Sequence, residues 1–230
     1  MINDQRIFIS FEGADGVGKS THVAFYANLL KSLGHDVVLV REPGGTKIGE
    51  QIRNILLDVN NDELTDESEL LLYLTARSQI VNEVIKPALD AGKIVLCDRF
   101  FDSTLAYQGY GRKMSEAFIK RANEFVVGDC VPSLTVLFYI PSDVQQERLG
   151  RRGATDRIES AGVDFAERVR SGFMQIAEQN PERIKLVDTS RKRSEVAKDV
   201  IRLASHLVSI DVNDTSVQEQ LAALDSAHER

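Results

Sequence analysis

Five short apolar runs recur along the chain, and each is bounded by residues that favour loops. They are rich in Val, Ile, Leu and Phe without a strict polar alternation, which is typical of strands covered on both faces of a parallel sheet. The runs lie at residues 7–11, 37–40, 94–97, 134–140 and 184–187. The pattern therefore predicts five buried parallel strands.

Longer stretches with the apolar spacing of helices separate these runs. Residues 20–33 end before Gly34, and residues 68–89 begin with polar residues and end before Gly92. Pro87 is expected to kink or shorten the last turn of the second stretch. Alternating strands and helices predict an α/β fold, a five-stranded parallel sheet with helices on both faces, and ligands at the carboxyl ends of the strands.

Length and composition favour one domain with an insertion. The chain has 230 residues, of which 43% are hydrophobic and 27% charged, close to the average for globular proteins. We assign residues 1–209 to the domain and predict that residues 148–162, where arginines surround glycines, form a basic lid inserted in it. Residues 210–230 are predicted to be a polar tail that is either disordered or carries a short helix.

Charge and cysteine content argue against several classes of protein. A formal net charge of -7 disfavours a broad basic surface for nucleic acid, so any phosphate binding must be local. The sequence has no apolar run of membrane-spanning length and no signal-peptide pattern at its start. Cys97 and Cys130 lack the spacing of metal ligands, which favours two buried thiols in a cytoplasmic protein over a disulfide.

The segment between the first apolar run and the first helical stretch matches the phosphate-binding pattern G-x-x-x-x-G-K-[ST], which predicts the P-loop NTPase fold. Its glycines let successive backbone N–H groups point at one spot, and the helix that follows adds the positive end of its dipole. Lys19 is expected to reach the β- and γ-phosphates of ATP, and the Ser20 hydroxyl to bind Mg²⁺. The predicted ATP site comprises Gly13, Ala14, Asp15, Gly16, Val17, Gly18, Lys19, Ser20 and Thr21.

A phosphate-binding loop does not name a reaction, because GTPases, motor ATPases, regulatory proteins and small-molecule kinases all carry one. A second candidate site follows the third apolar run, where Asp98 and Arg99 stand at the predicted carboxyl end of a strand. There a carboxylate can hold Mg²⁺ or its water, and a guanidinium can hold an anionic substrate. A buried ion pair at the start of a loop explains the same two residues equally well.

Four short strings then point to a family. They are REPGG at residues 41–45, GEQIR at 49–53, DRF at 98–100 and STLAYQG at 103–109. In this order and together with the phosphate-binding loop, they resemble the thymidylate kinases of the bacterial type, over a span from about residue 7 to about residue 207. The resemblance implies transfer of the γ-phosphoryl group of ATP to dTMP, with Mg²⁺, to give dTDP for DNA precursor synthesis. It also implies a cis peptide bond before Pro43 and a homodimer.

The resemblance implies a role for each matching residue. Asp15 would accept a hydrogen bond from the 3′-hydroxyl of dTMP, Tyr73 would stack on thymine, and Tyr107 would pack beneath the deoxyribose. Arg53 and Arg99 would hold the 5′-phosphate, a task that suits forked guanidinium groups. The residues that would complete the contacts to base, sugar or phosphate are Arg77, Ser103, Thr104 and Gln108.

The source of a further catalytic cation is also implied. Some members of the family carry an arginine inside the phosphate-binding loop, at the position that is Gly16 here, whereas bacterial-type members carry it in the lid. The residues expected to screen charge during transfer are Lys19, Arg99, Arg151 and Arg152. The sequence does not choose among the lid residues Arg151, Arg152 and Arg157, and a solvated charge cluster is the alternative reading.

Two other functions stay open on the sequence. A related nucleotide kinase would act on dUMP, GMP or CMP and would differ in the base contacts made by Tyr73 and Arg77. A regulatory ATPase with a P-loop would bind nucleotide but would have no use for an acceptor site. The expected partners are dTMP and ATP as small molecules and a second copy of the chain, with no nucleic acid and no membrane.

Overall fold

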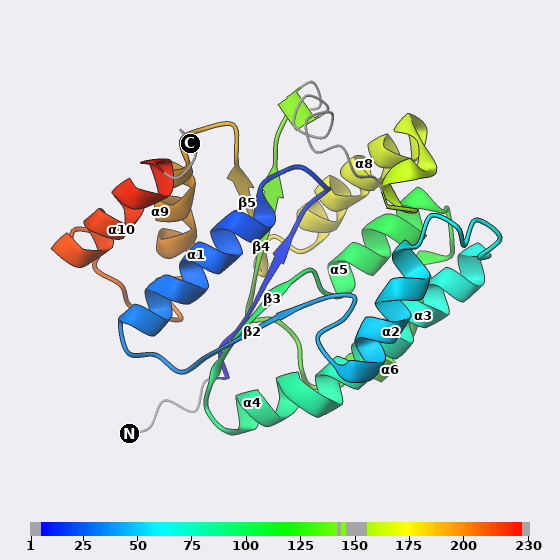
Figure 1. Cartoon of the computed structure of the whole chain (residues 1–230), viewed down its shortest axis with the longest axis horizontal. Coiled ribbons are helices and arrows are strands. Elements are labelled where there is room, and N and C mark those ends of the chain that lie inside the picture. Colours follow the sequence, from blue (N-terminus) through cyan, green and yellow to red (C-terminus); the bar gives the residue numbers. More distant parts are fainter. Residues whose placement is uncertain (1–5, 142–143, 146–155, 227–230) are drawn as a thin grey trace.

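The five predicted strands form a single parallel sheet. In the computed structural model, which describes residues 6–141, 144–145 and 156–226, the strand order is β2-β3-β1-β4-β5 (Figure 1). The strands are β1 Phe8–Glu12, β2 Val37–Arg41, β3 Ile94–Asp98, β4 Leu134–Tyr139 and β5 Ile184–Asp188. This confirms the predicted α/β fold.

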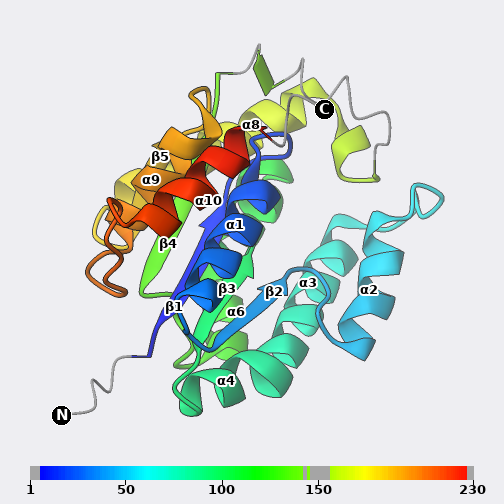
Figure 2. The same ribbon diagram turned by 60° about the vertical axis from the view of Figure 1, so that its left-hand side comes forward.

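Helices cover both faces of the sheet (Figures 1 and 2). One face packs against α1 Lys19–Ser32, α9 Arg193–Leu203 and α10 Thr215–Ser226. The other packs against α3 Asp66–Ile80, α6 Glu116–Val127 and α8 Val163–Gln179. The remaining segments are α2 Lys47–Leu57, η1 Val81–Ile85, α4 Lys86–Asp90, α5 Phe101–Thr104, η2 Leu105–Gly111 and η3 Glu159–Ala161. Successive strand side chains enter opposite layers, so both cores are apolar.

Strand register places the two candidate sites side by side. Strand β1 lies between β3 and β4, and Phe11 of β1 is paired with Asp98 of β3. The chain leaves β1 toward one edge of the sheet and leaves β3 toward the other. This change of direction between neighbouring parallel strands opens a crevice at their carboxyl ends. The phosphate-binding loop follows β1 and the Asp98–Arg99 pair ends β3, so both meet at this crevice.

The helical stretch predicted at residues 68–89 is interrupted. Helix α3 ends at Ile80, the wider π-helical turn η1 follows, and α4 continues to Asp90. Pro87 follows in the first turn of α4, and because α4 continues η1 without a break, its missing N–H leaves the preceding turn one hydrogen bond short. The irregularity therefore precedes the proline, and the last turn is retained.

The C-terminal segment adds a helix to the core between the sheet and α1. Val217 and Leu221 of α10 are buried against α1 and α9. Asp225 accepts hydrogen bonds from the backbone N–H and the hydroxyl of Ser194, at 2.9 Å and 2.7 Å, in the first turn of α9. Helix α9 has no capping bond from its own N-cap side chain, Lys192, so α10 supplies one.

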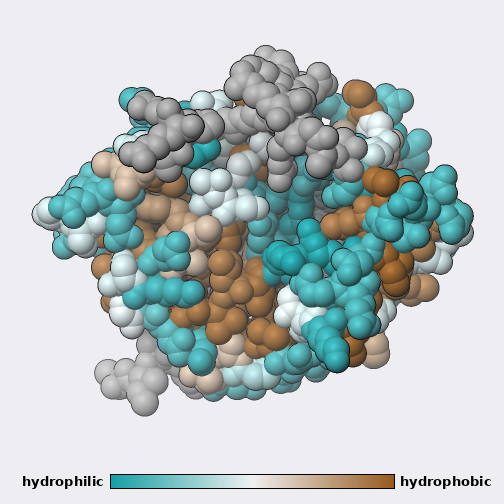
Figure 3. Space-filling view, viewed as in Figure 1, coloured by the Kyte–Doolittle hydropathy of each residue, from teal (hydrophilic) through white to brown (hydrophobic). Residues whose placement is uncertain are grey.

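The structure bears on two further expectations. Cys97 and Cys130 are buried free thiols, as predicted. Among the described residues, no helix combines the length and the apolar content that crossing a bilayer requires. Strand β2 forms one edge of the sheet. In the view of Figure 3, apolar residues gather over this strand, in the middle of the molecule.

Candidate active site

The phosphate-binding loop connects β1 to α1 through glycines that adopt left-handed backbone conformations. Gly13, Gly16 and Gly18 have φ angles of 133°, 79° and 89°. A Cβ atom on Gly13 would lie 2.3 Å from the carbonyl oxygen of Phe138, so this position also lacks room for a side chain. The loop thus needs glycine for both its conformation and its close approach to β4.

Lys19 begins α1 and folds back over the loop. Its ammonium group donates to the carbonyl oxygens of Gly13 and Ala14 at 2.9 Å and 3.0 Å. Burial and the nearby Arg99 lower the pKa of Lys19 to about 8, against the opposing effect of Asp15. An anionic phosphate beside this amine would stabilise its charged form, so the ammonium is suited to that ligand.

Ser20 and Asp98, the two residues predicted to bind Mg²⁺, are in direct contact. The Ser20 hydroxyl donates to Asp98 Oδ2 at 2.8 Å. The described residues hold no cluster of three or more His, Cys, Asp and Glu side chains that could bind a metal by themselves. A hydroxyl and a carboxylate beside a phosphate loop fit Mg²⁺, which keeps several waters and takes the rest of its ligands from phosphates.

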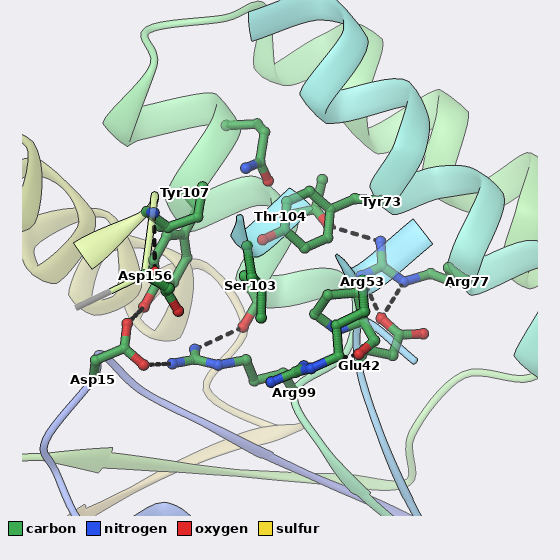
Figure 4. A pocket seen from close by; sticks show the side chains of 14 residues that line it. Asp15, Glu42, Arg53, Tyr73, Arg77, Arg99, Ser103, Thr104, Tyr107 and Asp156 are labelled. Atoms are coloured by element: carbon green, nitrogen blue, oxygen red, sulfur yellow. Dashed lines mark hydrogen bonds and ion pairs between the residues drawn. The ribbon is translucent and has the colours of Figure 1, made fainter. Parts of the chain in front are cut away.

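A cleft opens beside the loop, and all nine predicted acceptor residues line it (Figure 4). The space between its walls, counted together with the open mouth of the cleft, is about 560 Å³. The predicted residues in its wall are Asp15, Arg53, Tyr73, Arg77, Arg99, Ser103, Thr104, Tyr107 and Gln108. They come from the phosphate loop, α2, α3 and the continuous stretch from the end of β3 through α5 and η2, so the fold brings together four separate segments.

Asp15 joins the phosphate loop to the cleft. Its carboxylate accepts hydrogen bonds from Arg99 Nη2 at 2.6 Å and from the Tyr107 hydroxyl at 2.8 Å. Burial acts to raise the pKa of Asp15, but the charges of Arg99 and Lys19 and the Tyr107 bond outweigh it and hold the pKa well below its ordinary value. Asp15 is therefore an anion within reach of both sites.

Arg77 lies at the bottom of the cleft and is 1% exposed. Its guanidinium donates to Glu42 Oε2 at 2.9 Å and 2.6 Å, to Thr104 Oγ1 at 2.8 Å and to Asn123 Oδ1 at 2.7 Å. These bonds use all but one of its N–H groups. Arg77 is thus held rigidly by the protein, with one donor left for a ligand.

Arg53 of α2 also lines the cleft. It donates to the carbonyl oxygen of Pro43 at 2.9 Å, and the Glu42–Pro43 peptide bond is cis, as the resemblance implies. Burial and the neighbouring Arg41 lower the pKa of Arg53 from its ordinary value. An anion in the cleft would relieve the repulsion between these two guanidinium groups.

The chain was compared with known proteins. A family model described as thymidylate kinase matches residues 11–200. The chain belongs to the thymidylate kinase family. It is 45% identical to the thymidylate kinase of Desulfovibrio desulfuricans over 83% of this chain and 91% of that protein, and 45% identical to that of Kosmotoga olearia over 85% and 94%. It also resembles the crystal structure of thymidylate kinase from Ehrlichia chaffeensis, with a TM-score of 0.71, 36% identity and coverage of 86% of this chain and 98% of that one.

Five further residues line the cleft of this thymidylate kinase family member and were not among the predicted site residues. They are Glu42, Pro43, Leu57, Asp156 and Ile158. The REPGG string contains the first two, so a motif could have indicated them. Leu57 and Ile158 supply only apolar wall, and no spacing in the sequence marks such positions.

Of the predicted lid, residues 148–162, the structure describes only residues 156–162. Arg151 and Arg152 lie outside the described residues. Arg157, the third lid candidate, donates from Nη2 to Glu69 at 2.6 Å and from Nε to the carbonyl oxygen of Leu56 at 2.9 Å. Because Glu69 is fully buried on α3, these bonds anchor the end of the segment to the wall of the cleft.

Proposed function

We propose that this chain transfers the γ-phosphoryl group of ATP to the 5′-phosphate of dTMP, giving ADP and dTDP. One bond forms, from a dTMP phosphate oxygen to the γ-phosphorus, and one breaks, between that phosphorus and the β–γ bridging oxygen. The observation that carries the proposal is the cleft of nine acceptor residues that opens beside the phosphate loop and shares Asp15 with it. Membership of the thymidylate kinase family supports the same reaction.

The protein would act by placing two phosphates in line and screening their charge. Lys19 would hold the β- and γ-phosphates, and Arg99 would hold the acceptor phosphate from the other side. Ser20 and Asp98 would hold Mg²⁺, which would neutralise charge at the transferred group. The lid arginines Arg151 and Arg152 are the proposed source of a further cation over the transferred group.

The base contacts would select thymine. Tyr73 offers an aromatic plane at the wall of the cleft, and the remaining N–H of Arg77 offers a hydrogen bond to a base carbonyl. The Tyr107 ring, held by its bond to Asp15, would lie where a 2′-hydroxyl would have to fit. Deoxythymidine monophosphate would therefore be preferred to ribonucleotides and to monophosphates with larger bases.

Release of ADP from ATP and Mg²⁺ with a panel of monophosphates tests the proposal. The panel holds dTMP, dUMP, CMP and GMP at equal concentrations, each with and without the protein. We expect dTMP to give the highest kcat/KM. A higher value with another monophosphate would replace dTMP as substrate, and ADP release that is indifferent to all four would contradict a phosphoryl acceptor site.

We also propose that two copies of the chain pair, as the family resemblance implies. Exposed apolar side chains on α6 support this, because Phe125 is 89% exposed and Phe118, seven residues earlier, lies on the same side of the helix. Sedimentation analysis of Phe125→Glu should give a monomer. Leu186→Glu, at an exposed apolar position of edge strand β5, is the control that should stay paired.

We place the protein in the cytoplasm, where buried thiols stay reduced.

A further inference from the structure

A buried carboxyl group lies directly behind the acceptor cleft. Glu12 is the last residue of β1, and its side chain is completely buried. Its Oε1 accepts a hydrogen bond from the backbone N–H of Phe100 at 2.6 Å, and its Oε2 lies 2.5 Å from the hydroxyl of Ser103. Glu12 thus binds the turn that follows β3 at two points.

The same turn carries Arg99, whose backbone is in the left-handed region with φ of 70°. Residues other than glycine adopt this conformation only where their surroundings hold them in it. The N–H of Arg99 bonds to the carbonyl oxygen of Phe11, and the Phe100 N–H that follows bonds to Glu12. Adjacent peptide groups of the turn are therefore both tied to the end of β1.

The side chains of the turn are coupled as well. Arg99 Nη1 donates to Ser103 Oγ at 3.3 Å, and the same hydroxyl is bonded to Glu12, which does not line the cleft. Ser103 itself lines the cleft. A shift of the Glu12 carboxyl group would consequently move both a candidate phosphate ligand and a polar group of the acceptor wall.

Burial and the charge of Asp102 raise the pKa of Glu12 to about 8, against the effects of Ser103, Arg99 and Phe100. The charged and titratable groups that face it are Asp102, Arg99, Lys19, Arg183 and Cys97. Below that pH the protonated carboxyl can donate to Ser103 Oγ, which leaves the hydroxyl hydrogen of Ser103 free to point into the cleft. Above it the direction reverses, and Ser103 donates to Glu12 instead.

We propose that Glu12 is a positioning residue for phosphoryl transfer, whose carboxyl group holds the Arg99–Ser103 turn and sets the direction in which the Ser103 hydroxyl donates. A hydroxyl that donates into the cleft suits an anionic acceptor, whereas one that donates to Glu12 presents only lone pairs to it. Glu12 is fully buried and is not among the residues that line the cleft, so it would act through the turn and not by contact with the substrate. The inference rests on the acceptor role proposed above for the cleft.

Two substitutions separate this role from a purely structural one. Glu12→Gln keeps an acceptor for the Phe100 N–H and a permanent donor for Ser103, so it mimics the protonated acid at every pH. Glu12→Ala removes both bonds. Ile9→Val is the control, because Ile9 is fully buried on β1 but packs into the core beside α1, away from the turn.

The experiment measures kcat and KM for dTMP and for ATP from about pH 6.5 to about pH 9. Saturating ATP keeps phosphates beside Lys19, so that ionisation of Lys19 does not dominate the alkaline limb. Wild-type turnover of dTMP tests the proposed function, and the variants test only the inference.

In the wild type, kcat/KM for dTMP should fall as pH rises through about 8, and this fall should disappear in Glu12→Gln. Glu12→Ala should raise KM for dTMP or lower kcat by about tenfold or more, with KM for ATP changed about twofold at most. Ile9→Val should keep the wild-type profile even if its melting temperature drops. An alkaline fall that persists in Glu12→Gln would overturn the proposal. If Glu12→Ala does not fold, the comparison of the pH profiles of Glu12→Gln and the wild type decides by itself.

Discussion

The ion pair between Arg77 and Glu42 allows a quantitative test of how the cleft is built. The two side chains are 1% and 3% exposed and approach to 2.6 Å. Substitution Arg77→Met keeps most of the volume of the side chain but leaves the carboxylate of Glu42 buried without its cation. Breaking a buried pair in this way typically costs about 3–5 kcal/mol in the free energy of unfolding.

Proton uptake by Glu42 limits that cost. Burial already raises the pKa of Glu42, although Arg77 opposes the shift. Without Arg77 the pKa should rise further, so the folded variant binds a proton that the unfolded chain releases near its ordinary pKa. For a raised pKa the stabilising contribution is complete below the unfolded value and is lost as pH rises through the folded one. The loss of stability should therefore be larger at pH 8 than at pH 5.

Urea unfolding followed by circular dichroism measures the effect, with the slope of the transition checked for constancy. The double variant Arg77→Met, Glu42→Gln is the control, because it removes the uncompensated charge. We expect it to recover about 1–3 kcal/mol relative to the single variant. A single variant within about 1 kcal/mol of wild type at pH 8, or a double variant no more stable than the single one, would refute the reasoning.

Three further predictions concern the loop, the packing of α8 and the C-terminal helix. Lys19→Ala should lower kcat by about a hundredfold or more with an unchanged circular dichroism spectrum, and full turnover would contradict its phosphate role. Gly172→Ala should cost about 1–3 kcal/mol in urea unfolding, because its Cβ would lie 2.6 Å from the ring of Tyr110, whereas Ser171→Ala, which is exposed, should be neutral. Asp225→Ala should cost about 1 kcal/mol through the lost cap of α9, and Glu219→Ala, on the exposed side of α10, should cost nothing measurable in the same assay.

Local sequence patterns predicted the parts of the molecule whose physics is local. The five strands follow from apolar runs, and the phosphate loop follows from glycines that any chain needs for that backbone path. The wall of the acceptor cleft was a different case. Spacing alone did not decide whether Asp98 and Arg99 formed a site, and the residues of the cleft were indicated only by resemblance to a family.

The contacts that hold the site lie outside the reach of such patterns. Arg77 meets Glu42 across 35 residues and Asn123 across 46, and Glu12 meets Ser103 across 91. Pairings of this kind depend on which strands become neighbours, and that depends on the whole sheet. The same holds for Arg157, whose sequence context indicates a basic lid but whose guanidinium is bound to Glu69 across 88 residues.

The charged groups of the cleft are bonded to one another, and this matters for anyone who designs an inhibitor. Asp15 accepts hydrogen bonds from Arg99 and Tyr107, and Lys19 donates to carbonyl oxygens of the loop. A charged compound that binds these groups must therefore break nearly as many hydrogen bonds within the protein as it forms. Such exchanges yield little net binding free energy per contact. The apolar wall at Leu57 and Ile158 imposes no such exchange. Compounds that extend aromatic or aliphatic surface toward it should gain affinity faster than compounds that add phosphate mimics.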